Sequence, residues 1–170
     1  MGMKQAIKRL FSLDKKEESI LLYAPFCGRI VPLSEVKDET FALGILGEGV
    51  AVLPEENELR APLDGKVEQV FDSAHAVTLY THEGVELLMH IGIDTVELGG
   101  RYFDSCVAAG ELVKRGDPLI RFDRQAISNA GYDLTTPLVI GNSEEFEIKT
   151  VAQGEIGAGM PLLELHRKEE

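Results

Sequence analysis

The sequence predicts an all-β protein, a sandwich or barrel of short strands with a few single helical turns. Short runs rich in Val, Ile and Leu are interrupted by Gly or Pro about every ten residues, which is typical of such folds. Two segments of the chain also recur later in the sequence, which indicates a duplicated β motif. A length of 170 residues suits a single domain.

The expected strands begin at Ile20 and follow one another through the chain. They cover Ile20–Tyr23, Arg29–Leu33, Val50–Leu53, Lys66–Phe71, Ala76–Thr81, Val85–Ile93, Leu119–Phe122 and Leu138–Ile140. Two other stretches, Tyr102–Ala109 and Asp123–Ala130, are expected to form single helical turns.

The first repeat is Ala24-Pro25-Phe26-Cys27-Gly28-Arg29-Ile30, which returns 37 residues later as Ala61-Pro62-Leu63-Asp64-Gly65-Lys66-Val67. The second begins at Gly110-Glu111-Leu112, leads to Gly116-Asp117-Pro118-Leu119-Ile120, and returns from Gly154-Glu155-Ile156 to Gly159-Met160-Pro161-Leu162-Leu163. Pro and Gly fix the turns of both units. We therefore expect two similar half-structures packed together.

Residues 1–18 differ from residues 19–170, which we expect to form the one domain. Apolar residues fall at helical spacing and are surrounded by basic ones: Met3, Ile7, Leu10 and Phe11, with Lys4, Lys8, Arg9, Lys15 and Lys16. Such a flexible basic amphipathic segment lies on an anionic bilayer surface or, since so short a helix is marginal in water, forms a frayed arm.

Charge and composition limit the location and the partners. A net charge of −12 argues against nucleic acid, whose binding rests on Lys and Arg, and favours a basic protein partner or simple solubility. The sequence has no apolar run of the ~18–20 residues that a membrane span needs and no signal-peptide pattern. Cys27 and Cys106 fit no metal spacing and are expected to be small buried hydrophobes in the reducing cytoplasm.

Two of the four histidines, His75 and His90, are brought together if residues 74–94 form a hairpin. With His82 and Glu83 as the central turn residues, His75 and His90 face each other, with Cβ atoms about 4.5–5.5 Å apart. On this register the same face also carries Val77, Leu79 and Leu88. The fourth histidine, at position 166 in the polar tail, is expected to be exposed.

Two paired histidines on an apolar face have a structural, a metal-binding or a nucleophilic explanation. Zinc normally takes three or four protein ligands, and Asp94, the nearest candidate, lies roughly 13 Å along the strand from His90. A phosphoryl acceptor needs less, because a neutral imidazole is a competent nucleophile and a second one donates a hydrogen bond to a phosphoryl oxygen. The hydroxyl of Ser73 can support that second ring. The residues alone leave open which histidine carries the phosphoryl group.

The segment Gly84-Val85-Glu86-Leu87-Leu88-Met89-His90-Ile91-Gly92-Ile93-Asp94-Thr95-Val96-Glu97-Leu98 resembles the active-site signature of the glucose-type enzyme IIA of the bacterial phosphoenolpyruvate-dependent sugar phosphotransferase system. The resemblance covers about residues 20–167. It includes Ala24-Pro25 with Gly28, Ala61-Pro62 with Gly65, Gly47-x-Gly49-Val50-Ala51, Gly100-x-x-Phe103, and Thr136-Pro137-Leu138-Val139-Ile140 before Asn142.

The resemblance implies a β-sandwich of the duplicated hybrid motif type, the barrel-sandwich hybrid. It also implies that His90 is phosphorylated, that His75 binds the phosphoryl group non-covalently, and that Ser73 stands where the family often has threonine. Further residues match the family's partner-binding surface: the apolar Phe41, Ile45, Leu46, Phe71, Leu88 and Val96, and the acidic Asp38 and Asp94, which meet an arginine of the incoming phosphocarrier.

The implied cycle runs from the histidine phosphocarrier protein through His90 to a cysteine of the enzyme IIB domain of a glucose-class sugar permease. It requires no cofactor, although relatives also bind regulatory targets through zinc shared by both histidines and a partner's carboxylate. The implied location is the cytoplasm, with peripheral contact at the inner face of the plasma membrane through residues 1–18. The alternatives are a zinc metallohydrolase on a related hybrid fold, whose H-x-H element is missing from this sequence, and a regulatory binding module without phosphotransfer.

Overall fold

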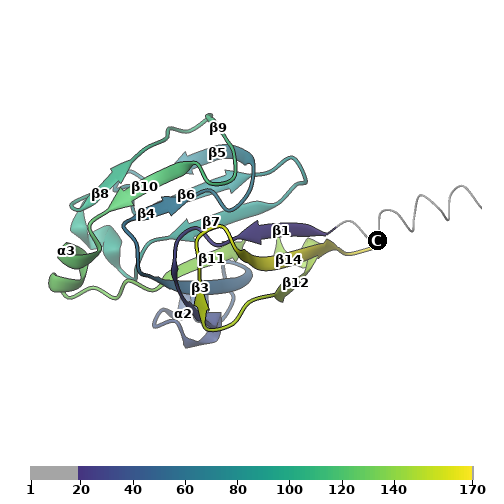
Figure 1. The fold of residues 1–170 in the computed structure, drawn as a ribbon, viewed down its shortest axis with the longest axis horizontal. Coiled ribbons are helices and arrows are strands. Elements are labelled where there is room, and N and C mark those ends of the chain that lie inside the picture. The colour runs from purple at the N-terminus through teal and green to yellow at the C-terminus, as the bar shows by residue number, and fades with distance from the viewer. Residues whose placement is uncertain (1–18, 170) are drawn as a thin grey trace, which may run out of the picture.

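The structure, a computed structural model, describes residues 19–169. The amphipathic segment expected over residues 1–18, and the membrane contact assigned to it, lie outside this range. Within it the chain consists of short antiparallel strands with a few single-turn helices (Figure 1). Over the described residues, no helix is long and apolar enough to cross a membrane.

The strands of the described residues form one large and two small sheets. The large sheet has the order β13 (Glu155–Ile156), β2 (Gly28–Val31), β3 (Glu48–Pro54), β11 (Thr136–Ile140), β7 (Glu86–His90), β6 (Ala76–Tyr80), β5 (Gly65–Val70) and β9 (Leu112–Val113). The small sheets are β1 (Ile20–Tyr23), β14 (Pro161–Arg167) and β12 (Phe146–Thr150), and β4 (Glu58–Arg60), β10 (Pro118–Phe122) and β8 (Phe103–Ser105). The helical turns are η1 (Leu33–Glu35), α2 (Glu39–Ala42), η2 (Thr95–Leu98), α3 (Arg124–Asn129) and η3 (Ser143–Glu145).

Each expected strand is present, with shifts of one to three residues at some ends. The helical turn expected near Asp123–Ala130 is α3, but the one expected over Tyr102–Ala109 is wrong. There the chain forms β8, in which Phe103 pairs with Phe122 of β10 and packs against the core. Burial of Phe103 in a sheet therefore outweighs the local helical pattern.

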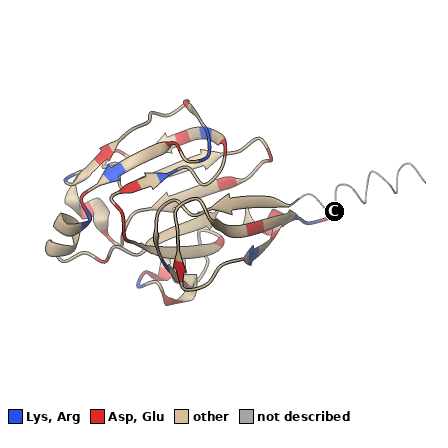
Figure 2. Ribbon diagram, viewed as in Figure 1, with Lys and Arg blue, Asp and Glu red and all other residues tan. Residues whose placement is uncertain are grey.

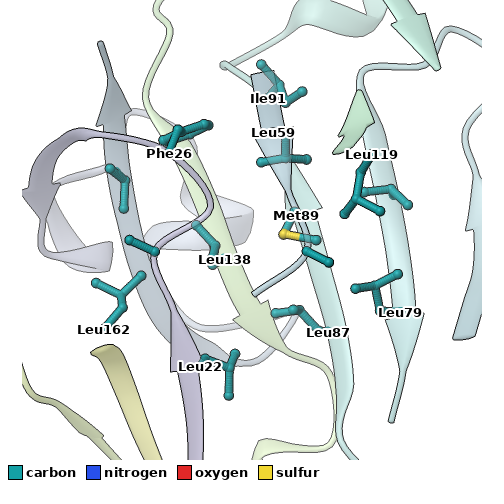
Figure 3. Packing of buried hydrophobic residues seen from close by; sticks show 14 of the residues in the cluster. Leu22, Phe26, Leu59, Leu79, Leu87, Met89, Ile91, Leu119, Leu138 and Leu162 are labelled. Carbon is teal, nitrogen blue, oxygen red and sulfur yellow. The ribbon is translucent and has the colours of Figure 1, made fainter. Parts of the chain in front are cut away.

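The hydrophobic core lies between the sheets and takes side chains from all three. Figure 3 shows Leu22 from β1, Leu59 from β4 and Leu119 from β10 packed with Leu87 and Met89 of β7. Side chains of a strand alternate between its two faces, so Leu88 and His90 point away from this core. On that other face a smaller cluster packs together: Val36, Phe41, Ala51, Ile93 and Val139, with Leu88 against it. The predicted β-sandwich is confirmed.

The duplication is repeated in the hydrogen bonds of the backbone. Gly28 and Arg29 of β2 pair with Ile156 and Glu155, just as Gly65 and Lys66 of β5 pair with Val113 and Leu112. The amide of Ala24 donates to the carbonyl of Met160, and that of Ala61 donates to the carbonyl of Asp117. The predicted duplication is therefore supported by matching backbone pairings in the two repeats.

Charged residues are dispersed over the part of the chain that the structure describes. Figure 2 shows Asp and Glu spread over loops and strands across the whole view, with fewer Lys and Arg among them.

Cys27 and Cys106 are free thiols, and both are partly exposed, so the expectation of buried cysteines is wrong. The thiol of Cys27 instead lies at the surface turn of Ala158, whose amide donates to Sγ over 3.4 Å.

Candidate functional site

The hairpin of β6 and β7 differs by one residue from the expected register. Ala76 is the residue opposite His90, because the turn holds three residues, His82 to Gly84, and not two. Thr81 and Val85 close the turn, and Gly84 takes the left-handed conformation with φ 84°. Val77 and Leu79 consequently face the core, so their predicted place on the histidine face is wrong.

His75 nevertheless meets His90, as predicted, because it lies just outside β6. The alternation of faces applies within a strand, and His75 follows a tight turn in which the amide of Ala74 donates to the carbonyl of Phe71 and Ala74 has φ 53°. The two imidazole rings are perpendicular, at 80°, with centroids 4.8 Å apart. The contact therefore depends on the irregular turn.

The hydrogen bond of His90 determines which of its nitrogens can react. Nδ1 lies 2.7 Å from the carbonyl oxygen of Gly92. A carbonyl oxygen only accepts, so Nδ1 carries the proton and Nε2 keeps its lone pair. The ring also contacts Phe41, with centroids 5.3 Å apart. His90 is thus a half-buried imidazole whose Nε2 keeps a lone pair that no hydrogen bond to Gly92 occupies.

Gly92 can present its carbonyl only because it has no side chain. Its φ is 76°, and a Cβ would lie 2.6 Å from Cγ2 of Thr95 and 2.8 Å from the carbonyl oxygen of Asp133. The next amide, that of Ile93, donates to the same carbonyl of Asp133 over 2.9 Å. The loop after β7 is therefore packed between Thr95 and the backbone of Asp133.

His75 is buried, with 3% of its surface exposed, and is oriented by Ser73. Its Nδ1 lies 2.7 Å from Oγ of Ser73, and its ring lies edge-on to Phe71 at 5.6 Å. Burial, and then the charge of His90, lowers the pKa of His75 to about 4. If the hydroxyl of Ser73 donates to Nδ1, Nε2 carries the proton and is a hydrogen-bond donor.

Burial also lowers the pKa of His90, against the opposing effects of the Gly92 carbonyl and of the Asp38 and Asp94 carboxylates. Both rings are therefore neutral at pH 7. The site offers a neutral imidazole with a lone pair on Nε2 beside a second neutral imidazole, with aromatic rings against both. Such a pair suits the transfer of a group that carries negative charge on several oxygens.

Comparison with known proteins identifies the family. The model of the family described as phosphoenolpyruvate-dependent sugar phosphotransferase system, EIIA 1, matches residues 20–166. The chain belongs to this family. The resemblance stated from the sequence is confirmed, and so is the expectation of a phosphotransferase component of that system.

Individual EIIA relatives support the assignment. The glucose-specific EIIA component of Staphylococcus epidermidis is 41% identical over 155 residues, which are 87% of this chain and 93% of that protein. The beta-glucoside-specific EIIBCA component of Dickeya chrysanthemi is 47% identical over 145 residues, which are 85% of this chain and 23% of that protein. The chain thus spans about a quarter of the multidomain relative. The glucose permease IIA of Mycoplasma capricolum has the same fold, with a TM-score of 0.83, 34% identity, and coverage of 87% of this chain and 96% of that one.

The residues that match the partner-binding surface of EIIA differ in exposure. Phe41 is buried against His90, while Phe71 and Leu88 are half-buried. Three others are exposed: Ile45 at 69%, Val96 at 54% and Leu46 at 40%. Sequence reasoning missed Leu43, which is 71% exposed just after α2 and belongs to the same run of apolar residues as Ile45 and Leu46.

Asp38 and Asp94, the two acidic residues that match the family's pattern, each lie directly before a short helical element. Asp38 caps α2, where its Oδ1 accepts from the amide of Thr40 over 2.9 Å. Asp94 is exposed before η2 with φ 60°. Both carboxylates act on His90, since both raise its pKa.

Asp94 is the nearest candidate for a third metal ligand beside His75 and His90. Among residues 19–169, no three His, Cys, Asp or Glu gather into a group that could hold a metal ion, so Asp94 does not complete a site with the histidines.

His166 does not lie in a polar tail but in β14, half-exposed, with Nε2 2.6 Å from Oε1 of Glu164.

Gly92 and Thr95 were named from the sequence only as members of the signature segment, and neither was given a role of its own. A glycine two residues after His90 is a signal that could have identified Gly92, because only glycine adopts its conformation freely. Thr95 gave no such signal.

Proposed function

We propose that this chain is a phosphocarrier that accepts a phosphoryl group on Nε2 of His90. In the first transfer the P–N bond of a phosphohistidine on the histidine phosphocarrier protein breaks, and a new P–N bond forms at His90. In the second, that bond breaks and a P–S bond forms with a cysteine of an enzyme IIB domain. The observation that carries the proposal is the hydrogen bond from Nδ1 of His90 to Gly92, which leaves Nε2 free to attack.

His75 acts in this proposal as the donor that stabilises the transferred group without bonding to it covalently. The rings are adjacent, and burial lowers the pKa of His75 to about 4, so His75 is a neutral N–H donor at pH 7. The charge of a transferring phosphoryl group is spread over its oxygens, and a fixed donor stabilises it. Ser73 keeps the donor oriented by bonding its other nitrogen.

The surroundings of the pair fit a transient protein partner. Phe41 and Phe71 pack on the imidazoles and keep water from the labile phosphohistidine. The exposed Ile45, Leu46 and Val96 provide an apolar contact area, to which we add Leu43. Asp38 and Asp94 lie where an arginine of the phosphocarrier can approach.

The sugar and the location follow from the relatives and the sequence. The relatives' names divide between glucose and beta-glucosides, so we assign the chain to a permease of the glucose class. We place the protein in the cytoplasm, with residues 1–18 as a peripheral contact to the inner face of the plasma membrane. Phosphotransfer needs no metal, but two imidazoles with centroids 4.8 Å apart can also hold zinc together with a partner's carboxylate.

Incubation with phosphoenolpyruvate, enzyme I and the phosphocarrier tests the proposal. His90→Gln should abolish phosphorylation because it removes the nucleophile. His75→Gln should still be phosphorylated but should pass the group to enzyme IIB more slowly. His82→Gln, on the exposed hairpin turn, is the matched control and should behave like the unaltered chain. An acid-labile phosphate on His90→Gln would overturn the assignment.

A further inference from the structure

The loop that follows β7 contacts both imidazole residues through its backbone. The amide of Ile91 donates to the carbonyl of His75 over 2.7 Å, and the carbonyl of Gly92 accepts from Nδ1 of His90 over 2.7 Å. The relative placement of the two histidines therefore depends on the path of the chain from Ile91 to Gly92.

Gly92 separates two planar peptide units, and each unit is held by a different group. The unit after Gly92 contains its carbonyl and the amide of Ile93, which donates to Asp133. The unit before Gly92 contains the carbonyl of Ile91, which accepts from the hydroxyl of Thr95. Because glycine can rotate between these planes more freely than any other residue, both planes must be held if the Gly92 carbonyl is to keep its direction.

The bond from Thr95 is protected from water. Thr95 and Ile91 are both fully buried, at 0% exposure. Without the hydroxyl, the carbonyl of Ile91 would have to find another donor, and the peptide unit would rotate to reach one. With that unit released, the direction of the Gly92 carbonyl toward Nδ1 of His90 would depend on the bond from Ile93 to Asp133 alone, and the carbonyl would hold that direction less well.

We infer that Thr95 is a positioning residue for phosphotransfer. Its hydroxyl fixes the peptide unit before Gly92, so that Gly92 keeps the proton of His90 on Nδ1 and the lone pair on Nε2. The kinetic part of this inference rests on the proposed function, whereas its effect on the His90 tautomer does not.

If Thr95 served only to pack against the loop, its methyl group would be needed and its hydroxyl would not. That methyl, Cγ2, is the group that a Cβ on Gly92 would meet at 2.6 Å, so it also packs against the loop. Two substitutions separate the roles: Thr95→Val keeps the shape and loses the hydroxyl, and Thr95→Ser keeps the hydroxyl and loses the methyl. Thr81→Val is the matched control. Thr81 is 1% exposed and lies at the turn of the β6–β7 hairpin, away from the histidines, where its hydroxyl accepts from the amide of Val85.

The experiment measures the imidazole tautomers by ¹⁵N NMR on the unphosphorylated chain, and the rate of His90 phosphorylation by the phosphocarrier. Thr95→Val should lower the fraction of His90 protonated on Nδ1 and slow phosphorylation about threefold to tenfold, the range expected for one lost hydrogen bond. Thr95→Ser should retain both properties. Thr81→Val should lose stability and leave both readouts unchanged.

The inference is overturned if Thr95→Val keeps the tautomer and the rate, if Thr95→Ser loses as much as Thr95→Val, or if Thr81→Val slows transfer equally. Should Thr95→Val fail to fold, Thr95→Ala paired with Thr95→Ser gives the same comparison, and equal spectra for those two would overturn the inference. If His90 is not the phosphoryl acceptor, His90→Gln will still be phosphorylated, and the proposed function is wrong. The tautomer measurement tests the role of Thr95 independently of that result.

Discussion

Replacing His75 should remove a defined part of the protein's response to acid. In the folded chain, burial and then the neighbouring His90 lower the pKa of His75 to about 4. The unfolded chain protonates the same imidazole near its ordinary value of about 6.5. The folded state therefore binds fewer protons than the unfolded state at every pH between these two values.

The sign and size of the effect follow by linkage. A lowered histidine pKa gives stability that is fully present above pH 6.5 and is lost as the pH falls to about 4. A difference of about 2.5 units, at 1.36 kcal/mol each, amounts to about 3 kcal/mol. Burial lowers the pKa of His90 in the same direction, and since the rings are neighbours, the measured effect belongs to the pair.

Urea unfolding of the unaltered chain and of His75→Gln at pH 7 and pH 4 tests this reasoning. Carboxylates contribute to the acid response of both chains, so the informative quantity is the difference between the two falls in unfolding free energy. We expect the fall to be smaller for His75→Gln by about 3 kcal/mol. His82→Gln, on the exposed turn, controls for the loss of an imidazole. Parallel falls for the unaltered chain and His75→Gln would show that His75 is not held neutral by burial.

Three further outcomes are expected from substitutions around the site. Ser73→Ala should slow transfer to enzyme IIB about threefold to tenfold while phosphorylation persists, because His75 loses the partner of its Nδ1, and Ser73→Thr should restore the rate in the same quench-flow measurement. Gly92→Ala should lower the unfolding free energy in urea by at least about 1–3 kcal/mol, because its φ is 76° and the added Cβ meets a backbone carbonyl at 2.8 Å. Ile45→Glu should raise the KM for the phosphocarrier and change stability by less than about 0.5 kcal/mol, whereas Leu112→Glu, at 82% exposure on β9, should change neither.

The fold could be predicted because the residues that bound its strands and form its turns can be recognised in the sequence. Gly or Pro is the terminal residue of several longer strands, as Gly65 is in β5, Pro118 in β10 and Pro161 in β14. The two Ala-Pro…Gly units also recur with the same partners, as the bonds of Ala24 and Ala61 demonstrate. Strands of two or three residues, such as β9, β13 and β4, are too short to show an alternation of polar and apolar residues, so the sequence does not reveal them.

The site could be predicted in its members but not in its geometry. The expected register had two central turn residues and so placed Gly84 opposite Thr81, whereas Gly84 is a third turn residue and Val85 lies opposite Thr81. A shift of one residue exchanges the faces of a strand. The pairing of His75 and His90 survives because Ala74, at φ 53°, lies in a tight turn directly before His75. A left-handed alanine carries no sequence signal, since the conformation is imposed by the bonds from Phe71 to the turn.

The charges around His90 bear on why the site would pass its phosphoryl group onward. Asp38 and Asp94 act on His90 with negative charge, so they stabilise an imidazolium but repel the phosphoryl oxygens that bonding to Nε2 would bring. A cation supplied by the bound partner would relieve that repulsion during each transfer, and its departure would restore it. A carrier gains from this arrangement, because a phosphohistidine that is too stable would not give up its group. In the proposed cycle, a neutral His75 would stabilise the phosphoryl oxygens by a hydrogen bond and not by a full positive charge, which would favour forming the intermediate without trapping it.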